Sequence, residues 1–329
     1  MAYDGRIMQR ALTRFDEDKQ RRAAQLEQRR RTAYARAPRL AEIEAELRGT
    51  MGRIISSALA RGTDPVPAIR VLRDENLQLQ RERAELLASL GYPADYLEEK
   101  PACVKCGDTG YVSGGVCACL RAYYAREQLA ELSRLLPLGE DSFETFSFDW
   151  YDSAVQPAFG ISPRENMERN YDVCRDYAYQ FAKGSGDLLL SGGTGLGKTF
   201  LSACIARVVS ENGFSVVYDT AASVFSRFED AKFRRDDGGS EDADRCMRCD
   251  LLILDDLGTE MTTSFVQSAL YQIVNGRLMA GRSTIISTNL APEEIGSRYG
   301  RSVLSRLEGE YEILPFFGED IRRLKRERQ

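Results

Sequence analysis

Residues 191–200 read SGGTGLGKTF, and this stretch decides the fold class. It fits the pattern G-x-x-x-x-G-K-[S/T], directly after the apolar run DLLLSG and directly before a helical pattern. Glycines there let backbone N–H groups wrap a phosphate, and the start of the following helix adds positive potential. The stretch therefore predicts a loop that binds the phosphates of a nucleoside triphosphate.

The phosphate-binding loop supplies most of the candidate ligands for ATP. Lys198 is expected to neutralise the β- and γ-phosphates and so to assist catalysis, and the Thr199 hydroxyl is expected to coordinate Mg²⁺. The full set of predicted loop ligands is Gly192, Gly193, Thr194, Gly195, Leu196, Gly197, Lys198 and Thr199.

A second motif, LLILDD at residues 251–256, complements this loop. Its four apolar residues predict a buried strand, whose carboxyl end would deliver two acids to the ligand crevice. Asp255 is expected to hold Mg²⁺, directly or through water, and Asp256 to orient and deprotonate the attacking water.

From residue 164 onward, helical patterns alternate with short apolar runs. This rhythm predicts an α/β domain over residues 164–329, a three-layer fold with a parallel sheet between helices. The polar, acidic stretch RRDDGGSEDADRC (residues 234–246) is expected to be a loop. The predicted strands are residues 187–192, 215–220, 250–256, 283–289 and 311–316.

Composition narrows the chemistry and the location. The 329 residues are 43% hydrophobic and 29% charged, and no apolar run approaches the length of a membrane span. The start of the chain lacks a secretory signal, so we expect a cytoplasmic protein without a membrane partner. Histidine is absent, which excludes histidine bases and imidazole metal ligands.

The first 137 residues predict a mostly helical domain that binds a partner. Apolar residues at coiled-coil-like intervals before and after RGTDPVP (residues 61–67) indicate an antiparallel helical hairpin, although dimerisation through either helix stays open. Residues 138–163, acidic and aromatic, are interpreted as the linker to the ATP-binding domain, with aromatic side chains docked on a neighbouring surface.

Four cysteines predict a metal site within the N-terminal domain. Cys103 and Cys106 form a C-x₂-C pair, and Cys117 and Cys119 form a C-x-C pair ten residues later. Four thiolates at this spacing can close a tetrahedral Zn²⁺ site around a small hairpin. Free thiols and an iron–sulfur cluster are the alternatives. A further pair, Cys246 and Cys249, has no second pair nearby, and ordinary thiols are the interpretation there.

The motifs SGGTGLGKTFL, DLLILDDLG, TIISTNL and GRSVLSRLEGEYEILPFFGEDIR occur in the order of a known group. Over residues 165–325 the chain resembles the AAA+ ATPases of the DnaC/DnaI helicase-loader and IstB transposition-helper group. The resemblance implies that Asn289 is the sensor-1 residue, Arg306 the arginine finger and Arg322 the sensor-2 arginine. Arg301 is a weaker candidate for the finger.

The helical and cysteine-bearing N-terminal half is similar in architecture to the DnaI-type loaders. This likeness implies an ATP-dependent loader that holds a DnaB-family replicative helicase and assembles with its own copies around single-stranded DNA. Lys232, Arg234, Arg235 and the basic tail are weak candidates for DNA contacts. Two alternatives stay open: an IstB-like transposition helper acting on duplex DNA, and a nucleotide-gated adaptor that needs no turnover.

Overall fold

The computed structural model describes residues 3–59, 66–135, 142–233 and 237–328. By their contacts they form two compact units, residues 13–117 and residues 1–12 together with 118–329. None of the helices in the described part of the chain is long and apolar enough to cross a membrane.

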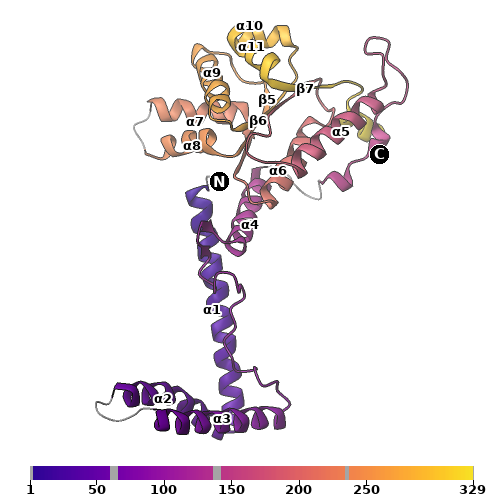
Figure 1. Cartoon of the computed structure of the whole chain (residues 1–329). Helices are drawn as coiled ribbons and strands as arrows, with labels where there is room; N and C mark the ends of the chain where they lie inside the picture. The colour runs from indigo at the N-terminus through magenta and orange to yellow at the C-terminus, as the bar shows by residue number, and fades with distance from the viewer. Residues whose placement is uncertain (1–2, 60–65, 136–141, 234–236, 329) are drawn as a thin grey trace. The chain divides into compact units, whose positions relative to one another are not determined.

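The unit of residues 13–117 is built from helices. The helix α1 (Gly5–Arg36) is followed by α2 (Arg39–Leu59) and α3 (Val66–Ser89), and the last two lie side by side in Figure 1. Their direction is antiparallel, because Glu44 near the start of α2 pairs with Arg83 near the end of α3 at 2.8 Å. The predicted hairpin is confirmed. Arg83 lies among the apolar residues between its two helices and makes this half-buried ion pair there.

The larger unit contains a five-stranded sheet, in which every pair of neighbouring strands is parallel and the order is β4-β5-β6-β3-β7. This confirms the predicted parallel α/β fold. The strands are β3 (Asp187–Gly192), β4 (Val216–Thr220), β5 (Leu251–Leu257), β6 (Ser283–Thr288) and β7 (Tyr311–Phe316).

Helices cover both faces of this sheet (Figure 1). Alternate strand residues face opposite sides, so Leu188 and Leu190 belong to one apolar core and Leu189 to the other. The first core includes residues of α4 (Ala118–Leu135), α5 (Pro163–Tyr179) and α6 (Lys198–Glu211). The second includes residues of α7 (Ala221–Phe233), α8 (Asp237–Arg248), α9 (Ser264–Met279), α10 (Pro292–Tyr299) and α11 (Arg301–Glu310).

The loop prediction for residues 234–246 is wrong for its described part, because α8 begins at Asp237. One face of this helix is anchored in the protein. The Cys246 side chain is fully buried, and Arg245 pairs with Asp4 at 2.6 Å and with Glu131 at 2.7 Å. Tertiary contacts of this kind override the poor helix propensity of glycine and aspartate.

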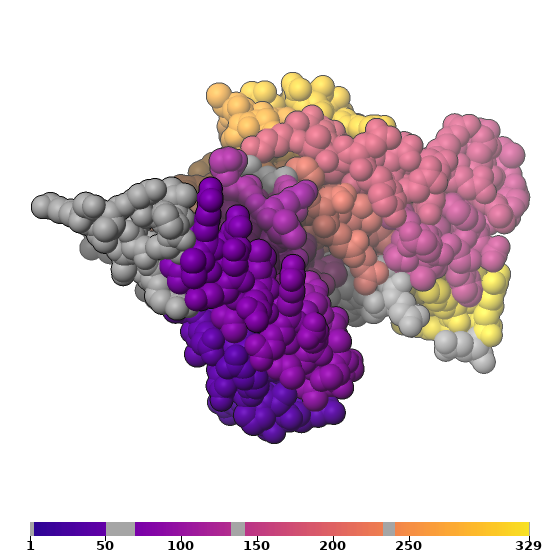
Figure 2. Space-filling model, turned by 60° about the horizontal axis from the view of Figure 1, so that its bottom comes forward, coloured from indigo at the N-terminus to yellow at the C-terminus, as the bar shows by residue number. Residues whose placement is uncertain are grey.

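The aromatic segment before α5 packs onto the larger unit, as predicted. It contains two short 3₁₀ turns, η1 (Phe143–Thr145) and η2 (Phe148–Trp150), and Phe143 is buried in the first core. The Trp150 ring receives the cationic groups of Lys325 and Arg328, in and just after α12 (Ile321–Glu327), at 5.6 and 4.6 Å from its centroid. Figures 1 and 2 both show the yellow C-terminal helix beside this magenta segment.

Candidate nucleotide-binding site

The predicted phosphate-binding loop connects β3 to α6 in a conformation that requires glycine at several positions. Gly192 has φ 147°, and a Cβ there would lie 1.9 Å from the Phe316 carbonyl oxygen. Gly195 has φ 71°, and its Cβ would lie 1.9 Å from the Asp320 carboxylate. Larger residues would therefore push β7 or the start of α12 away from the loop.

Lys198 is the first residue of α6, and its side chain turns back into the loop. The ammonium donates to the carbonyl oxygens of Gly192 and Gly193, at 2.6 Å each. Only 6% of the residue is exposed, and this burial lowers the pKa of the Lys198 ammonium. A buried ammonium held by neutral carbonyls is well placed to exchange them for phosphate oxygens.

The two acids lie at a bulge near the carboxyl end of β5, where the register with β6 shifts between Leu254 and Leu257. Asp255 is buried, and its Oδ1 accepts from the Thr199 hydroxyl at 3.4 Å. Asp256 adopts the left-handed conformation, with φ 55°. Its side chain is exposed and lines a cavity beside the phosphate-binding loop. The bulge therefore separates the carboxylates, one toward Thr199 and one toward the ligand space.

Burial, together with the neighbouring Asp255 carboxylate, raises the pKa of Asp256 above that of an ordinary aspartate. The cationic groups of Lys198 and Arg322 act in the opposite direction. A carboxylate with a raised pKa is a better proton acceptor than an aspartate with the ordinary pKa, which suits a general base.

A cavity of about 430 Å³ lies beside the loop. The structure places Lys198, Thr199, Asp256, Asn289 and Arg322 together around it, although they are widely separated in the sequence. Such a space is of the size that small-molecule sites have. From the phosphate-binding loop, Thr194, Gly195, Leu196 and Gly197 also line it, whereas Gly192, Gly193 and Asp255 are not among its lining residues.

Other residues of this cavity were not predicted as site residues. Phe146, Trp150 and Tyr151 of the aromatic segment line it, and the Tyr151 hydroxyl donates to the Leu196 carbonyl at 3.1 Å. Ile321 and Lys325 of α12 line it too, and the Ile321 N–H donates to the Gly195 carbonyl at 3.0 Å. The aromatic character of residues 143–151 is the signal in the sequence, and on its own it predicts docking on a neighbouring surface rather than contact with a ligand.

Arg306 lies on α11, half-buried, and is not among the residues that line this cavity. Within the described ranges, neither Arg306 nor Arg301 has a hydrogen-bond or ion-pair partner. Among the weak DNA-contact candidates, Lys232 lies 5.4 Å from the Phe265 ring centroid, and Arg234 and Arg235 are outside the described residues.

Residues 173–329 match the model of the family described as IstB-like ATP binding protein. These residues resemble DnaC/IstB-like AAA+ ATPases, and we call them the AAA+ domain.

Two curated relatives resemble the chain. YdaV, an uncharacterized protein of Escherichia coli (strain K12), is 31% identical over 161 residues, which are 45% of this chain and 64% of YdaV. The replicative helicase loader DnaC of the same strain is 30% identical over 135 residues, 40% of this chain and 54% of DnaC. The chain thus spans 64% and 54% of the lengths of these two relatives.

A crystal structure of the DnaC helicase loader is also similar, at 20% sequence identity and a TM-score of 0.46. The match covers 55% of this chain and 99% of that one.

The cysteine cluster that precedes the AAA+ domain forms in the structure. The sulfur atoms of Cys103, Cys106, Cys117 and Cys119 all lie within 4.8 Å of one another, and those of Cys103 and Cys117 are 3.7 Å apart. A tetrahedral site with Zn–S bonds of 2.3 Å has S···S edges of about 3.8 Å, so the four thiols fit this ion. The predicted hairpin between the pairs is present as β1 (Tyr111–Val112) and β2 (Gly115–Val116).

Cys246 and Cys249, within the AAA+ domain, have different surroundings. Both are buried free thiols. The guanidinium of the fully buried Arg277 donates to both of their carbonyl oxygens, at 2.6 and 3.1 Å, and to the Cys249 sulfur at 3.3 Å. They therefore hold α8 against α9 through Arg277.

Substituting one cysteine of the cluster is expected to remove bound zinc. Cys103→Ser should reduce the zinc content of the purified protein from about one ion per chain to near zero, because a three-thiolate site is open. Elemental analysis measures the content, and Cys204→Ala, which changes a buried thiol of α6, should keep the ion. Equal zinc content in the two variants would contradict this assignment.

Proposed function

We propose that the chain is an ATP-dependent replicative helicase loader. It would bind a DnaB-family helicase through its N-terminal domain (residues 1–137), which contains the four cysteines, and single-stranded DNA through an assembly of AAA+ domains. The observation that carries the proposal is the likeness to the replicative helicase loader DnaC, combined with the gathering of Lys198, Asp256 and Arg322 around one cavity.

The roles proposed for the site follow from its geometry. Lys198 exchanges the Gly192 and Gly193 carbonyls for phosphate oxygens, and Asp256 accepts the proton of the attacking water. Thr199 and Asp255 offer the hard oxygen ligands that Mg²⁺ prefers, and the ion would neutralise charge on the triphosphate. The resemblance to AAA+ ATPases implies that Asn289 orients the water and that Arg322 binds the γ-phosphate, and both residues line the cavity.

Self-association into a ring or spiral is part of the same proposal. Arg306 does not line the cavity of its own chain, and within the described residues it has no partner that would hold it elsewhere. A guanidinium in this situation is available to the nucleotide of a neighbouring copy, where it would stabilise the charge of the transferred phosphoryl group.

The segment of the cysteine cluster is the proposed helicase contact. It exposes apolar side chains: Val104, between Cys103 and Cys106, at 88% and Tyr111 of β1 at 50% of their possible surface. Exposed apolar surface is typical of protein-binding sites.

We expect the purified protein to co-elute with the replicative helicase encoded in the same genome when ATP is present. Val104→Glu should weaken that complex about tenfold or more, because it places a charge within the apolar contact. The matched control is Val155→Glu, which charges an exposed valine of the other unit. Absence of any complex with the unmodified protein, under ATP, would overturn the loader proposal.

A second candidate is an IstB-like transposition helper, which the family match over residues 173–329 favours. In that case the AAA+ domains would assemble on duplex DNA and recruit a transposase. Tighter binding to duplex than to single-stranded DNA, together with capture of a transposase from native lysate with ATP, would favour this candidate over the loader.

A further inference from the structure

Tyr218 contacts the metal-binding acid of the proposed site, although no sequence motif singled it out. It lies on β4, in register with Ile253 of β5, and is 3% exposed. Its hydroxyl donates to Oδ2 of Asp255 at 2.8 Å. The pair is buried, so water does not compete for this hydrogen bond.

The other oxygen of Asp255 is held from the opposite side of β5. Ser287 on β6 donates its hydroxyl to Oδ1, and the same hydroxyl accepts the N–H of Asp256 at 3.0 Å. Oδ1 is also the atom that faces Thr199. Hydroxyls from the two neighbouring strands thus fix the plane of the carboxylate and turn one oxygen toward the phosphate-binding helix.

We propose that Tyr218 is a positioning residue for metal-dependent nucleotide hydrolysis. It occupies Oδ2 of Asp255, so that Oδ1 stays directed at Thr199 and at the Mg²⁺ that accompanies the triphosphate. This inference rests on the proposed ATPase function. Outer-shell partners of metal-binding carboxylates are known to act in this way, by orienting the ligand atom.

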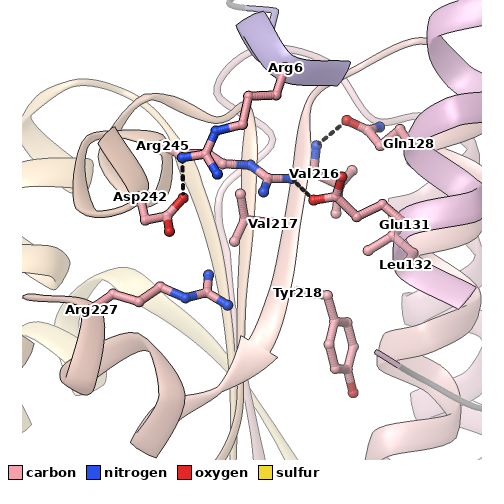
Figure 3. Close-up of a pocket in the computed structure, with 10 residues that line it drawn as sticks. All are labelled: Arg6, Gln128, Glu131, Leu132, Val216, Val217, Tyr218, Arg227, Asp242 and Arg245. Carbon is pink, nitrogen blue, oxygen red and sulfur yellow. Dashed lines mark hydrogen bonds and ion pairs between the residues drawn. The ribbon is translucent and has the colours of Figure 1, made fainter. Parts of the chain in front are cut away.

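The surroundings of Tyr218 suit a permanent hydrogen-bond donor. The side chain is buried, and its hydroxyl has the Asp255 carboxylate as its hydrogen-bond acceptor. Figure 3 shows this hydroxyl pointing away from the ion pairs of Arg6 with Asp242 and Arg245 with Glu131, which lie around the same small cavity.

The strand that carries Tyr218 is itself fixed from α4. The Gln128 side chain accepts the N–H of Val216 at 3.1 Å (Figure 3). It also donates to the carbonyl of Phe214 at 2.7 Å. These contacts satisfy edge groups of β4 that would otherwise need water. Tyr218 therefore lies on a strand that is anchored by α4 and paired with β5, and its hydroxyl is bound to Asp255.

The test compares Tyr218→Phe with the control Tyr177→Phe. The Tyr177 hydroxyl donates to the Gly186 carbonyl at 3.0 Å, just before β3, whereas the phosphate-binding loop follows the other end of that strand. ATP turnover and ATP affinity are measured across a Mg²⁺ series. Affinity is read from the fluorescence of Trp150, the only tryptophan of the chain, which lines the cavity. For Tyr218→Phe we expect turnover to fall about 10- to 100-fold and the Mg²⁺ midpoint to rise about 10-fold or more.

Affinity for ATP in the presence of a chelator should stay unchanged in Tyr218→Phe, because the phosphate-binding loop is intact. Ser287→Ala should shift the Mg²⁺ midpoint in the same direction. A midpoint within twofold of the unmodified protein, or an equal shift in Tyr177→Phe, would overturn the inference. If the unmodified protein binds ATP·Mg²⁺ but does not hydrolyse it, the proposed function fails. The Mg²⁺ midpoint of ATP binding then still shows whether Tyr218 positions the Asp255 carboxylate.

Discussion

Asp256→Asn is expected to reduce ATP turnover by about 10²- to 10⁴-fold, the contribution typical of a general base. Asparagine keeps the size of the side chain and tolerates the left-handed backbone that Asp256 adopts at φ 55°, so the bulge of β5 should be preserved. An amide cannot accept the proton of the attacking water, and this is the property that the substitution removes.

ATP binding should survive in Asp256→Asn, because the contacts of Lys198 and of the loop backbone do not involve this carboxylate. Phosphate release measures turnover, and the fluorescence of Trp150 measures binding. The control is Asp172→Asn, which alters an exposed acid of α5 that pairs with Arg175. If Asp256→Asn keeps more than about a tenth of the turnover of the unmodified protein, Asp256 is not the general base.

This variant also separates the loader from a nucleotide-gated adaptor. An adaptor needs only the bound state, so helicase binding and biological activity would both persist in Asp256→Asn. A loader that uses hydrolysis to release its partner would bind the helicase and then fail to leave it. Survival of the function in cells that carry the variant would therefore identify a switch.

Residues whose chemistry demands a special backbone were the most predictable from the sequence. The glycines of SGGTGLGKTF are needed because Gly192 and Gly195 have positive φ and no room for a Cβ, so the motif carries its own structural explanation. The pair of aspartates was predictable because it ends a buried apolar strand in a chain that already contains a phosphate-binding loop.

Residues that act through tertiary contacts could not be predicted. Tyr218 belongs to the strand SVVYDT, where tyrosine is an ordinary strand former, and only the pairing of β4 with β5 brings its hydroxyl to Asp255. Ser287 is equally inconspicuous within STIISTN. Helix α8 could not be predicted because its stabilising partners are distant in the sequence. Arg245 pairs with Glu131, and the Cys246 carbonyl accepts from Arg277.

Arg306→Ala is expected to reduce turnover by about 10³-fold or more, the value typical of an arginine finger. The loss should not come from nucleotide binding, because Arg306 does not line the cavity of its own chain. Trp150 fluorescence should therefore report the same ATP affinity for Arg306→Ala as for the unmodified protein. Arg301→Ala, at the start of the same helix, is the matched control and should lose much less turnover.

Mixing two inactive variants tests whether Arg306 acts between copies. Lys198→Ala should lose ATP binding at its own loop but keep an intact Arg306, whereas Arg306→Ala keeps an intact loop. In a mixed assembly, some Arg306→Ala sites then receive the arginine of a Lys198→Ala neighbour, and turnover should recover above the sum of the two separate proteins. Turnover equal to that sum would contradict a role of Arg306 in trans. If Arg301→Ala is inactive and recovers turnover when it is mixed with Lys198→Ala, Arg301 would be the arginine finger. Recovery in the first mixture alone would mean that the site at SGGTGLGKTF is completed by a second copy of the chain.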